Sequence, residues 1–176
     1  MKILVVIDMQ NDFIDGALGT KEAVRILSNV GQKIKEYRKS GIPVIFTRDT
    51  HQENYLDTQE GRNLPVPHCI YNTKGWQISE VLEVADSAII DKPTFGSAQL
   101  AQYIQSEYPD LDLEIELIGL CTDICVISNA MILKAFFPEA RIMVDASCCA
   151  GVTPDSHKTA LEAMKVCQVS ILNEAL

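Results

Sequence analysis

An excess of positive charge and long apolar segments are both missing from this sequence of 176 residues. Lysine and arginine number 15 against 24 aspartate and glutamate residues, so the formal net charge is −9. Nucleic-acid binders need a basic face to displace counterions, so this balance argues against that class. No apolar run approaches a membrane span, and the N-terminal run ends at Asp8, too soon for the core of a signal peptide. We therefore expect a cytoplasmic protein with no nucleic-acid or membrane partner.

Disulfides are not expected either, although the chain has six cysteines. A reducing cytoplasm disfavours a disulfide framework. Cys121 and Cys125, four residues apart in G-L-C-T-D-I-C-V, are then core residues, half of a metal site, or a pair that includes a nucleophile. Their C-x-x-x-C spacing lacks the C-x-x-C pattern typical of zinc and redox sites.

Composition and length indicate one ordinary globular domain. Hydrophobic residues make up 47% and charged residues 22% of the chain. A chain of this length can bury one large core, and it contains no repeats, linkers or low-complexity segments. We expect a single domain over residues 1–176.

Short apolar runs alternate with longer stretches of helical period. The predicted strands are Ile3–Ile7, Pro43–Thr47, Ala88–Ile90, Leu113–Ile118, Arg141–Val144 and Gln168–Leu172. The predicted helices are Lys21–Lys39, Ser97–Tyr108, Ile124–Phe137 and Pro154–Cys167. Apolar strands without alternation are typical of a parallel sheet buried on both faces. The pattern predicts an open α/β sheet with helices on both faces.

One polar segment, from Asp49 to about Trp76, interrupts this alternation. It has no helical period and is too long for a simple connection, which indicates a functional loop. In open α/β sheets, ligands bind beyond the carboxyl ends of the strands. Ionisable or nucleophilic residues follow four predicted strands, at Asp8, Asp49, Lys92 and Cys125.

Cys125 falls where a helix is expected to begin, with Thr122 and Asp123 as candidate caps. A thiol in a first helical turn is near the positive end of the helix dipole, and a nearby lysine such as Lys92 would lower its pKa further. Asp8 could act as a base, and free N–H groups at the helix end could bind an oxyanion. Position alone leaves a plainer alternative open: a core cysteine, a surface lysine and a strand-end aspartate.

Three motifs favour the catalytic alternative. V-V-I-D-M-Q-N-D-F, D-K-P-T-F-G-S and G-L-C-T-D-I-C-V follow one another over almost the whole chain and together resemble the isochorismatase-like cysteine hydrolases, which include nicotinamidases. The resemblance implies a Rossmann-like, mostly parallel six-stranded sheet. It also implies that Asp8 is the general base, Lys92 its cationic partner and Cys125 the acyl-forming nucleophile. A cis Leu120–Cys121 peptide bond and an oxyanion hole from the N–H groups of Cys121 and Cys125 are implied as well.

The polar loop contains candidate metal ligands. Asp49 and His51 in D-x-H face one way on an extended segment, and Glu60 and His68 follow in the same loop. Imidazoles with carboxylates suit zinc, iron or manganese better than calcium, although the spacing alone also fits a solvated polar loop. The resemblance to nicotinamidases implies that these four residues bind a divalent metal, with zinc the leading choice and manganese or iron as alternatives.

The expected reaction is hydrolysis of a small carboxamide, with nicotinamide as the leading substrate. Nicotinamidases commonly carry a tryptophan shortly before the second histidine, whereas here Leu64–Pro67 precede His68 and Trp76 follows it. Phe13 remains a candidate wall of the substrate pocket. Two alternatives stay open: another hydrolase of the family, acting on a ureido or N-carbamoyl compound or on isochorismate, and a non-catalytic metal or thiol module.

Other residues are expected to play structural roles. Cys148 and Cys149 should pack near the crevice with side chains pointing apart, Cys167 should be in the core, and Cys69 should be near the site without a chemical role. His157 should be structural or exposed. We also expect a homo-oligomer, either a dimer or a tetramer.

Overall fold

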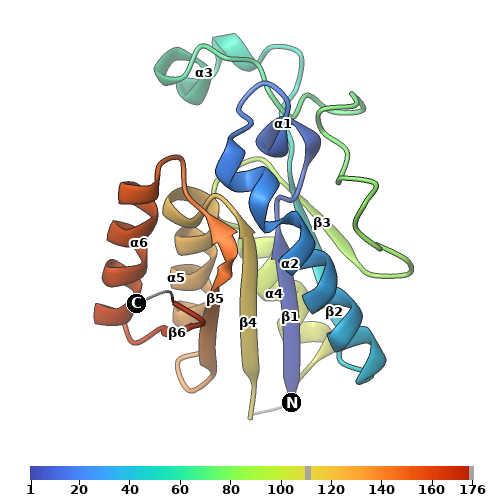
Figure 1. The fold of residues 1–176 in the computed structure, drawn as a ribbon, viewed down its shortest axis with the longest axis vertical. Coiled ribbons are helices and arrows are strands. Elements are labelled where there is room, and N and C mark those ends of the chain that lie inside the picture. The colour runs from blue at the N-terminus through green and yellow to red at the C-terminus, as the bar shows by residue number, and fades with distance from the viewer. Residues whose placement is uncertain (110–111, 175–176) are drawn as a thin grey trace.

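The structure, a computed structural model, describes residues 1–109 and 112–174. Six strands in these residues form one parallel sheet with the order β3-β2-β1-β4-β5-β6 (Figure 1). Their bounds are β1 (Lys2–Ile7), β2 (Val44–Asp49), β3 (Ile89–Lys92), β4 (Glu114–Leu120), β5 (Arg141–Ala150) and β6 (Ser170–Leu172). This strand order is that of a Rossmann fold, so the predicted fold class is confirmed.

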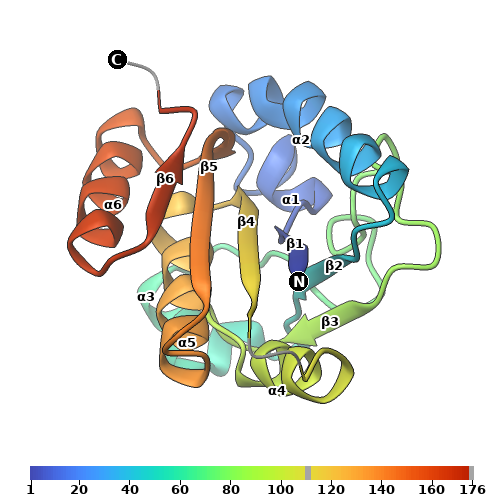
Figure 2. The same cartoon turned by 90° about the horizontal axis from the view of Figure 1, so that it is seen from below.

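Helices cover both faces of the sheet, as Figure 2 shows with α2 on one side and α4 and α5 on the other. The helices are α1 (Asn11–Ile14), α2 (Lys21–Lys39), α3 (Gln59–Asn63), α4 (Ala98–Glu107), α5 (Ile127–Phe136) and α6 (Pro154–Val166). The range of α2 agrees with the prediction at both ends. A 3₁₀ turn at Tyr55–Asp57 and helices α1 and α3 were not predicted, since each is too short to show a helical period.

The central strands are apolar on both sides because both sides are covered. In β1, Ile3, Val5 and Ile7 pack into the core beneath α4 and α5, whereas Leu4 and Val6 pack into the core beneath α2. All five side chains are fully buried. The uninterrupted apolar run at the N-terminus thus has its physical explanation in the two helical layers.

β5 extends six residues beyond the predicted end at Val144. The sequence signal stops there because Asp145 follows, but Asp145 is buried and its carboxylate pairs with Lys33 of α2. Further along β5, Cys148 packs into one core and Cys149 into the other, so their side chains point apart as predicted. A buried ion pair thus lets an acidic residue occupy a central strand position.

Gly119 brings β1 and β4 close together at their carboxyl ends. Its φ is +117°, and a Cβ placed on it would lie 2.1 Å from the Ile7 carbonyl oxygen. Only glycine tolerates this backbone conformation and this approach. The switch point of the sheet lies between these two strands, so the glycine shapes the place where a ligand site is expected.

None of the helices in the described residues is long and apolar enough to cross a membrane.

Candidate active site and metal cluster

Asp8, Lys92 and Cys125 come together beyond the carboxyl ends of the central strands. Asp8 follows β1, Lys92 ends β3, and Cys125 lies in the turn after β4. Lys92 Nζ is 2.6 Å from Asp8 Oδ2 and 3.5 Å from Cys125 Sγ. Asp8 and Lys92 are fully buried and Cys125 is 4% exposed, so the alternative of a surface lysine is wrong.

The backbone of Asp8 turns sharply at the end of β1. Its φ is +47°, a conformation that non-glycine residues adopt rarely and mostly where surrounding contacts enforce it. Thr47 Oγ1 donates to Asp8 Oδ1 at 2.6 Å, and the Asp8 N–H donates to the same hydroxyl at 3.2 Å. Thr47 therefore orients the carboxylate, so that its other oxygen faces Lys92.

The charges of this group shift the pKa values of its members. Burial lowers the pKa of Lys92, but Asp8, Cys125 and Asp49 together raise it more, and the ammonium is held charged. Burial raises the pKa of Asp8, and Lys92 only partly offsets that effect. Burial and the charge of Asp8 raise the pKa of the Cys125 thiol well above its usual value, despite Lys92. The sequence-based expectation of a lowered pKa is therefore wrong for the free protein, and the resting thiol holds its proton.

The turn that carries Cys125 is a π-helical turn over Thr122–Val126, and α5 begins only afterwards. The predicted caps are wrong: this turn has no side-chain cap, because Thr122 and Asp123 bond to the β5–α6 region instead. The Leu120–Cys121 peptide bond is cis, as the resemblance implied. Within the described residues the Cys121 N–H donates no backbone hydrogen bond, so it is available to a substrate oxygen.

The four proposed metal ligands form a second cluster beside the first. Asp49 ends β2, and the loop after it brings His51, Glu60 and His68 back, with all four ligand atoms within 4.8 Å of one another. Asp49 Oδ2 is 3.0 Å from His51 Nε2 and 3.6 Å from His68 Nε2. Glu60 Oε1 is 3.6 Å and 3.8 Å from the same two nitrogens.

The geometry of this cluster fits a divalent metal ion. Ligands about 2.0–2.2 Å from zinc are roughly 3.3–3.5 Å apart in a tetrahedral site, close to the separations seen here. His68 Nδ1 bonds to the Val66 carbonyl at 2.8 Å, which leaves Nε2 to face the cluster. Burial raises the pKa of Asp49, but hydrogen bonds from the two histidines and the charge of Lys92 lower it more, so the carboxylate stays ionised.

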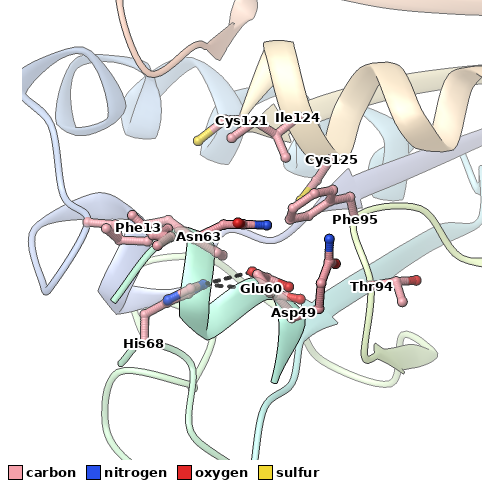
Figure 3. Close-up of a pocket in the computed structure, with 13 residues that line it drawn as sticks. Phe13, Asp49, Glu60, Asn63, His68, Thr94, Phe95, Cys121, Ile124 and Cys125 are labelled. Atoms are coloured by element: carbon pink, nitrogen blue, oxygen red, sulfur yellow. Dashed lines mark ion pairs between the residues drawn. The ribbon is translucent and has the colours of Figure 1, made fainter. Parts of the chain in front are cut away.

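The group around Cys125 and the cluster of proposed metal ligands face one pocket of about 430 Å³ (Figure 3). Cys125 and Cys121 line it on one side, and Asp49, Glu60 and His68 line it on another. Further lining residues that are apolar or amide-bearing are Phe13, Leu18, Leu64, Phe95, Ile124, Gln59 and Asn63. The predicted wall residue Phe13 is thus placed in the pocket, 5.5 Å from the His68 ring between centroids.

No tryptophan reaches the wall of this pocket among the described residues, and Trp76 lies elsewhere. Its indole N–H donates to Thr50 Oγ1 at 2.9 Å, and Arg48 stacks on its ring at 3.6 Å. Phe95, from the loop after β3, supplies an aromatic ring to the pocket instead, and it is 45% exposed.

Gln10 is a site residue that the sequence analysis missed. It is fully buried, its amide nitrogen donates to the carbonyl oxygens of Asp49 and Trp76 at 2.8 Å, and its amide oxygen accepts from the Asp49 N–H at 2.7 Å. It therefore fixes the backbone of Asp49, the first proposed metal ligand. The available signal was a neutral amide three residues beyond the first strand, within the first motif.

Asn11 and Asp12, next in the same motif, anchor the far end of the polar loop. Asn11 Nδ2 donates to the Lys74 carbonyl at 2.8 Å, and Asp12 Oδ2 accepts from the Cys69 N–H at 2.7 Å. Cys69 is fully buried beside His68, and burial with the charge of Asp49 raises its pKa.

One prediction about the remaining cysteines is wrong: Cys167, the C-cap residue of α6, is exposed. Cys148 and Cys149 are buried near the carboxyl end of β5, where Cys149 pairs with Gly119 of β4. All six cysteines are free in the described chain, as expected.

Comparison with known proteins assigns the family. The isochorismatase domain model matches residues 2–174. The chain belongs to the isochorismatase family. A nicotinamidase/pyrazinamidase from Mycobacterium tuberculosis is 25% identical over 192 residues, covering 98% of each chain. The family and the fold make this chain a nicotinamidase-like member of the isochorismatase-like hydrolases.

Solved structures of the family superpose over nearly the full length. Pyrazinamidase of Pyrococcus horikoshii, in complex with zinc, matches with a TM-score of 0.84 at 26% identity, covering 98% of this chain and 99% of that one. N-carbamoylsarcosine amidase from Thermoplasma acidophilum matches with a TM-score of 0.80, also at 26% identity, covering 99% and 98%. The family thus contains amidases of different specificity on the same fold.

Proposed function

We propose that this chain is a metal-containing cysteine amidase that hydrolyses a small carboxamide, with nicotinamide as the leading substrate and nicotinate and ammonia as products. The observation that carries the proposal is the pocket between two clusters. Cys125, with Asp8 and Lys92 behind it, faces Asp49, Glu60 and His68 across one cavity. A small flat amide could reach both clusters at once.

The first half of the reaction uses the buried ion pair as a proton relay. Cys125 Sγ attacks the amide carbon while the thiol proton moves to the Asp8 carboxylate. The N–H groups of Cys121 and Cys125 stabilise the oxygen that becomes negative. Asp8 then protonates the leaving nitrogen, the C–N bond breaks, and ammonia leaves a thioester on Cys125.

The second half reverses the proton movement. A water molecule attacks the thioester and gives a proton to Asp8, the C–S bond breaks, and the acid is released as the proton returns to the sulfur. Lys92 stays charged throughout and offsets the negative charge that passes between Asp8 and Cys125. The raised pKa of the thiol suits this scheme, because the proton needs to leave only as the bond to carbon forms.

Asp49, His51, Glu60 and His68 would hold the metal ion, with zinc the leading choice. When bound, the ion supplies open coordination positions for water and for a ring nitrogen of the substrate. The chain's own contribution is to orient that ring: Phe13 contacts the His68 ring and lines the same cavity.

An N-carbamoyl compound is the second candidate substrate. The structural similarity to N-carbamoylsarcosine amidase supports it, as does the pocket, which lacks tryptophan in its wall among the described residues. The same cysteine chemistry would cleave the terminal amide of such a compound.

Ammonia release from a matched panel tests the proposal. Nicotinamide, pyrazinamide, benzamide and N-carbamoylsarcosine would be compared at equal concentration with zinc-loaded protein. We expect turnover of nicotinamide and much slower turnover of benzamide, which has the same shape without a ring nitrogen. Turnover of the N-carbamoyl compound alone would support the second candidate, and equal rates for nicotinamide and benzamide would overturn the role given to the metal.

We further propose that the protein acts in the cytoplasm as a homo-oligomer. The net charge of −9 and the lack of long apolar runs support the first part. Light scattering after size-exclusion chromatography tests the second part, with a dimer or tetramer expected and a monomer contradicting it.

A further inference from the structure

The turn that carries the nucleophile has two sides. One side lines the pocket through Cys121, Ile124 and Cys125, as Figure 3 shows. The other side packs against the N-terminal end of α6, which contributes nothing to the pocket wall among the described residues. A residue on α6 that contacts this turn can therefore affect the pocket indirectly, through the turn.

His157 of α6 makes the central contact on that second side. Its Nδ1 lies 2.8 Å from Thr122 Oγ1 in a hydrogen bond. Thr122 is fully buried and directly follows Cys121, whose N–H is the proposed oxyanion donor. Burial lowers the pKa of His157 below its usual value, so the ring is neutral near pH 7 and Nδ1 can accept the hydroxyl proton.

Two neighbouring features place His157 at this distance. Gly151, directly after β5, lies so close to α6 that a Cβ on it would be 2.8 Å from the His157 backbone nitrogen and 2.9 Å from its Cα. Asp123, the next residue of the turn, accepts a hydrogen bond from the Val152 N–H at 3.1 Å. The turn is thus attached to the segment that leads into α6 at two consecutive residues, Thr122 and Asp123.

We propose that His157 is a positioning residue of the hydrolase: through Thr122 it holds the Cys121 N–H in the orientation that stabilises the reaction's oxyanion. This inference rests on the proposed function, which uses that N–H. Asp8 and Lys92, which set the environment of the Cys125 thiol, are held by contacts among the ends of β1, β2 and β3, and Asn129 of α5 donates to the Cys125 carbonyl at 2.8 Å. Loss of the His157 bond should therefore affect transition-state stabilisation more than the reactivity of the thiol.

The test separates an effect on oxyanion stabilisation from an effect on the reactivity of the Cys125 thiol. Loss of one oxyanion donor costs roughly 10²–10³ in kcat, so misorienting one should cost roughly 10- to 100-fold. We expect His157→Ala to lower kcat for nicotinamide by that factor with little change in KM. Alkylation of Cys125 by iodoacetamide, which develops no oxyanion, should stay within about twofold of the wild-type rate.

Matched variants identify the hydrogen bond as the cause. His157→Asn places an amide near the position of Nδ1 and should restore most of kcat, whereas His157→Gln should not. Thr122→Val removes the same bond from the other side, and the double variant should be no slower than either single variant. Lys158→Ala, an exposed neighbour on α6, is the control and should behave as wild type.

Several results would overturn the role of His157. Unchanged kcat in His157→Ala, or a parallel loss of kcat and alkylation rate, would mean that the bond does not position the oxyanion donor. Should His157→Ala fail to fold, the nearly isosteric Thr122→Val carries the same test. Absence of amide turnover by the wild-type protein would instead overturn the proposed function, and this role with it.

Discussion

Cys121 and Cys125 differ in what their side chains can do, although both line the pocket. Cys125 Sγ lies 3.5 Å from Lys92 Nζ, whereas burial raises the pKa of the Cys121 thiol to about 12 and Lys92 offsets little of that effect. The proposed contribution of Cys121 is its backbone N–H, which any L-residue supplies.

The first prediction compares alanine variants of these two cysteines. Cys125→Ala should abolish amide turnover, because the thioester cannot form, while Cys121→Ala should keep at least about a tenth of kcat, since its N–H remains. Steady-state ammonia release measures both, with circular dichroism to establish folding. Equal loss in two folded variants would contradict the division of roles.

The second prediction concerns the buried lysine. Lys92 lowers the pKa of the Cys125 thiol against the larger effects of burial and Asp8, so Lys92→Met should raise that pKa further. The iodoacetamide reaction of Cys125 should then slow about tenfold or more at pH 7, and its pH profile should move to higher pH. Methionine keeps the volume of the lysine stem, and thermal unfolding would establish that the variant folds. An unmoved profile would remove Lys92 from this role.

At the scale of elements, a buried ion network joins α2 to the centre of the sheet. Lys33 of α2 lies 2.9 Å from Glu116 of β4 and 2.5 Å from Asp145 of β5, and Tyr37 donates to Glu116. Both carboxylate side chains are at most 1% exposed. Burial raises their pKa values, but Lys33 and the other hydrogen-bond donors around each carboxylate together lower them more, so both pKa values lie below their usual range.

The third prediction is that Lys33→Met destabilises the fold by roughly 3–5 kcal/mol at pH 7, because two buried carboxylates lose their shared cation. Urea unfolding measures this value. Lys165→Met, which removes an exposed ion pair on α6, is the matched control and should change stability little. A similar small effect of both variants would show that the network contributes no net stability.

The loss of stability in Lys33→Met should depend on pH, and the lowered pKa values of Glu116 and Asp145 set the sign of this dependence. Groups with a lowered pKa in the folded state stabilise it above their usual values, 4.5 for Glu116 and 3.8 for Asp145. That stability is lost as the pH falls through the folded values. The difference in unfolding free energy between wild type and Lys33→Met should therefore be largest near pH 7 and shrink below about pH 4.

At the scale of the whole molecule, the proposed metal site is separable from the core. Three of its four proposed ligands lie on the loop between β2 and β3, whereas the sheet is held by the two apolar cores on its faces. Removal of the ion should therefore change the loop and leave the sheet folded.

The fourth prediction follows from this separation. Chelator-treated protein should lose amidase activity, keep its circular dichroism spectrum and still be alkylated at Cys125, since Asp8 and Lys92 set the environment of the thiol. Activity should return on adding zinc, manganese or iron. Full activity in protein shown by elemental analysis to be metal-free would contradict the proposed role of the ion.

The sequence alone determined the sheet, the long helices and the residues at the strand ends. This was possible because burial on both faces forces apolar runs such as Ile3–Ile7, and because a parallel sheet brings its strand ends together. The D-x-H pair and the three motifs could also be recognised in the sequence, because their residues are close together along the chain or directly follow predicted strands.

Only the tertiary structure decided the properties that depend on partners distant in the sequence. Asp145 fits inside β5 because Lys33 reaches it from α2, and Gln10 acts on Asp49 because β1 and β2 are adjacent. His157 contacts Thr122 across 35 residues, and the pKa of Cys125 is raised rather than lowered because burial and Asp8 outweigh Lys92. Local patterns report the period and chemistry of a segment, whereas burial and electrostatic fields arise from the packed molecule as a whole.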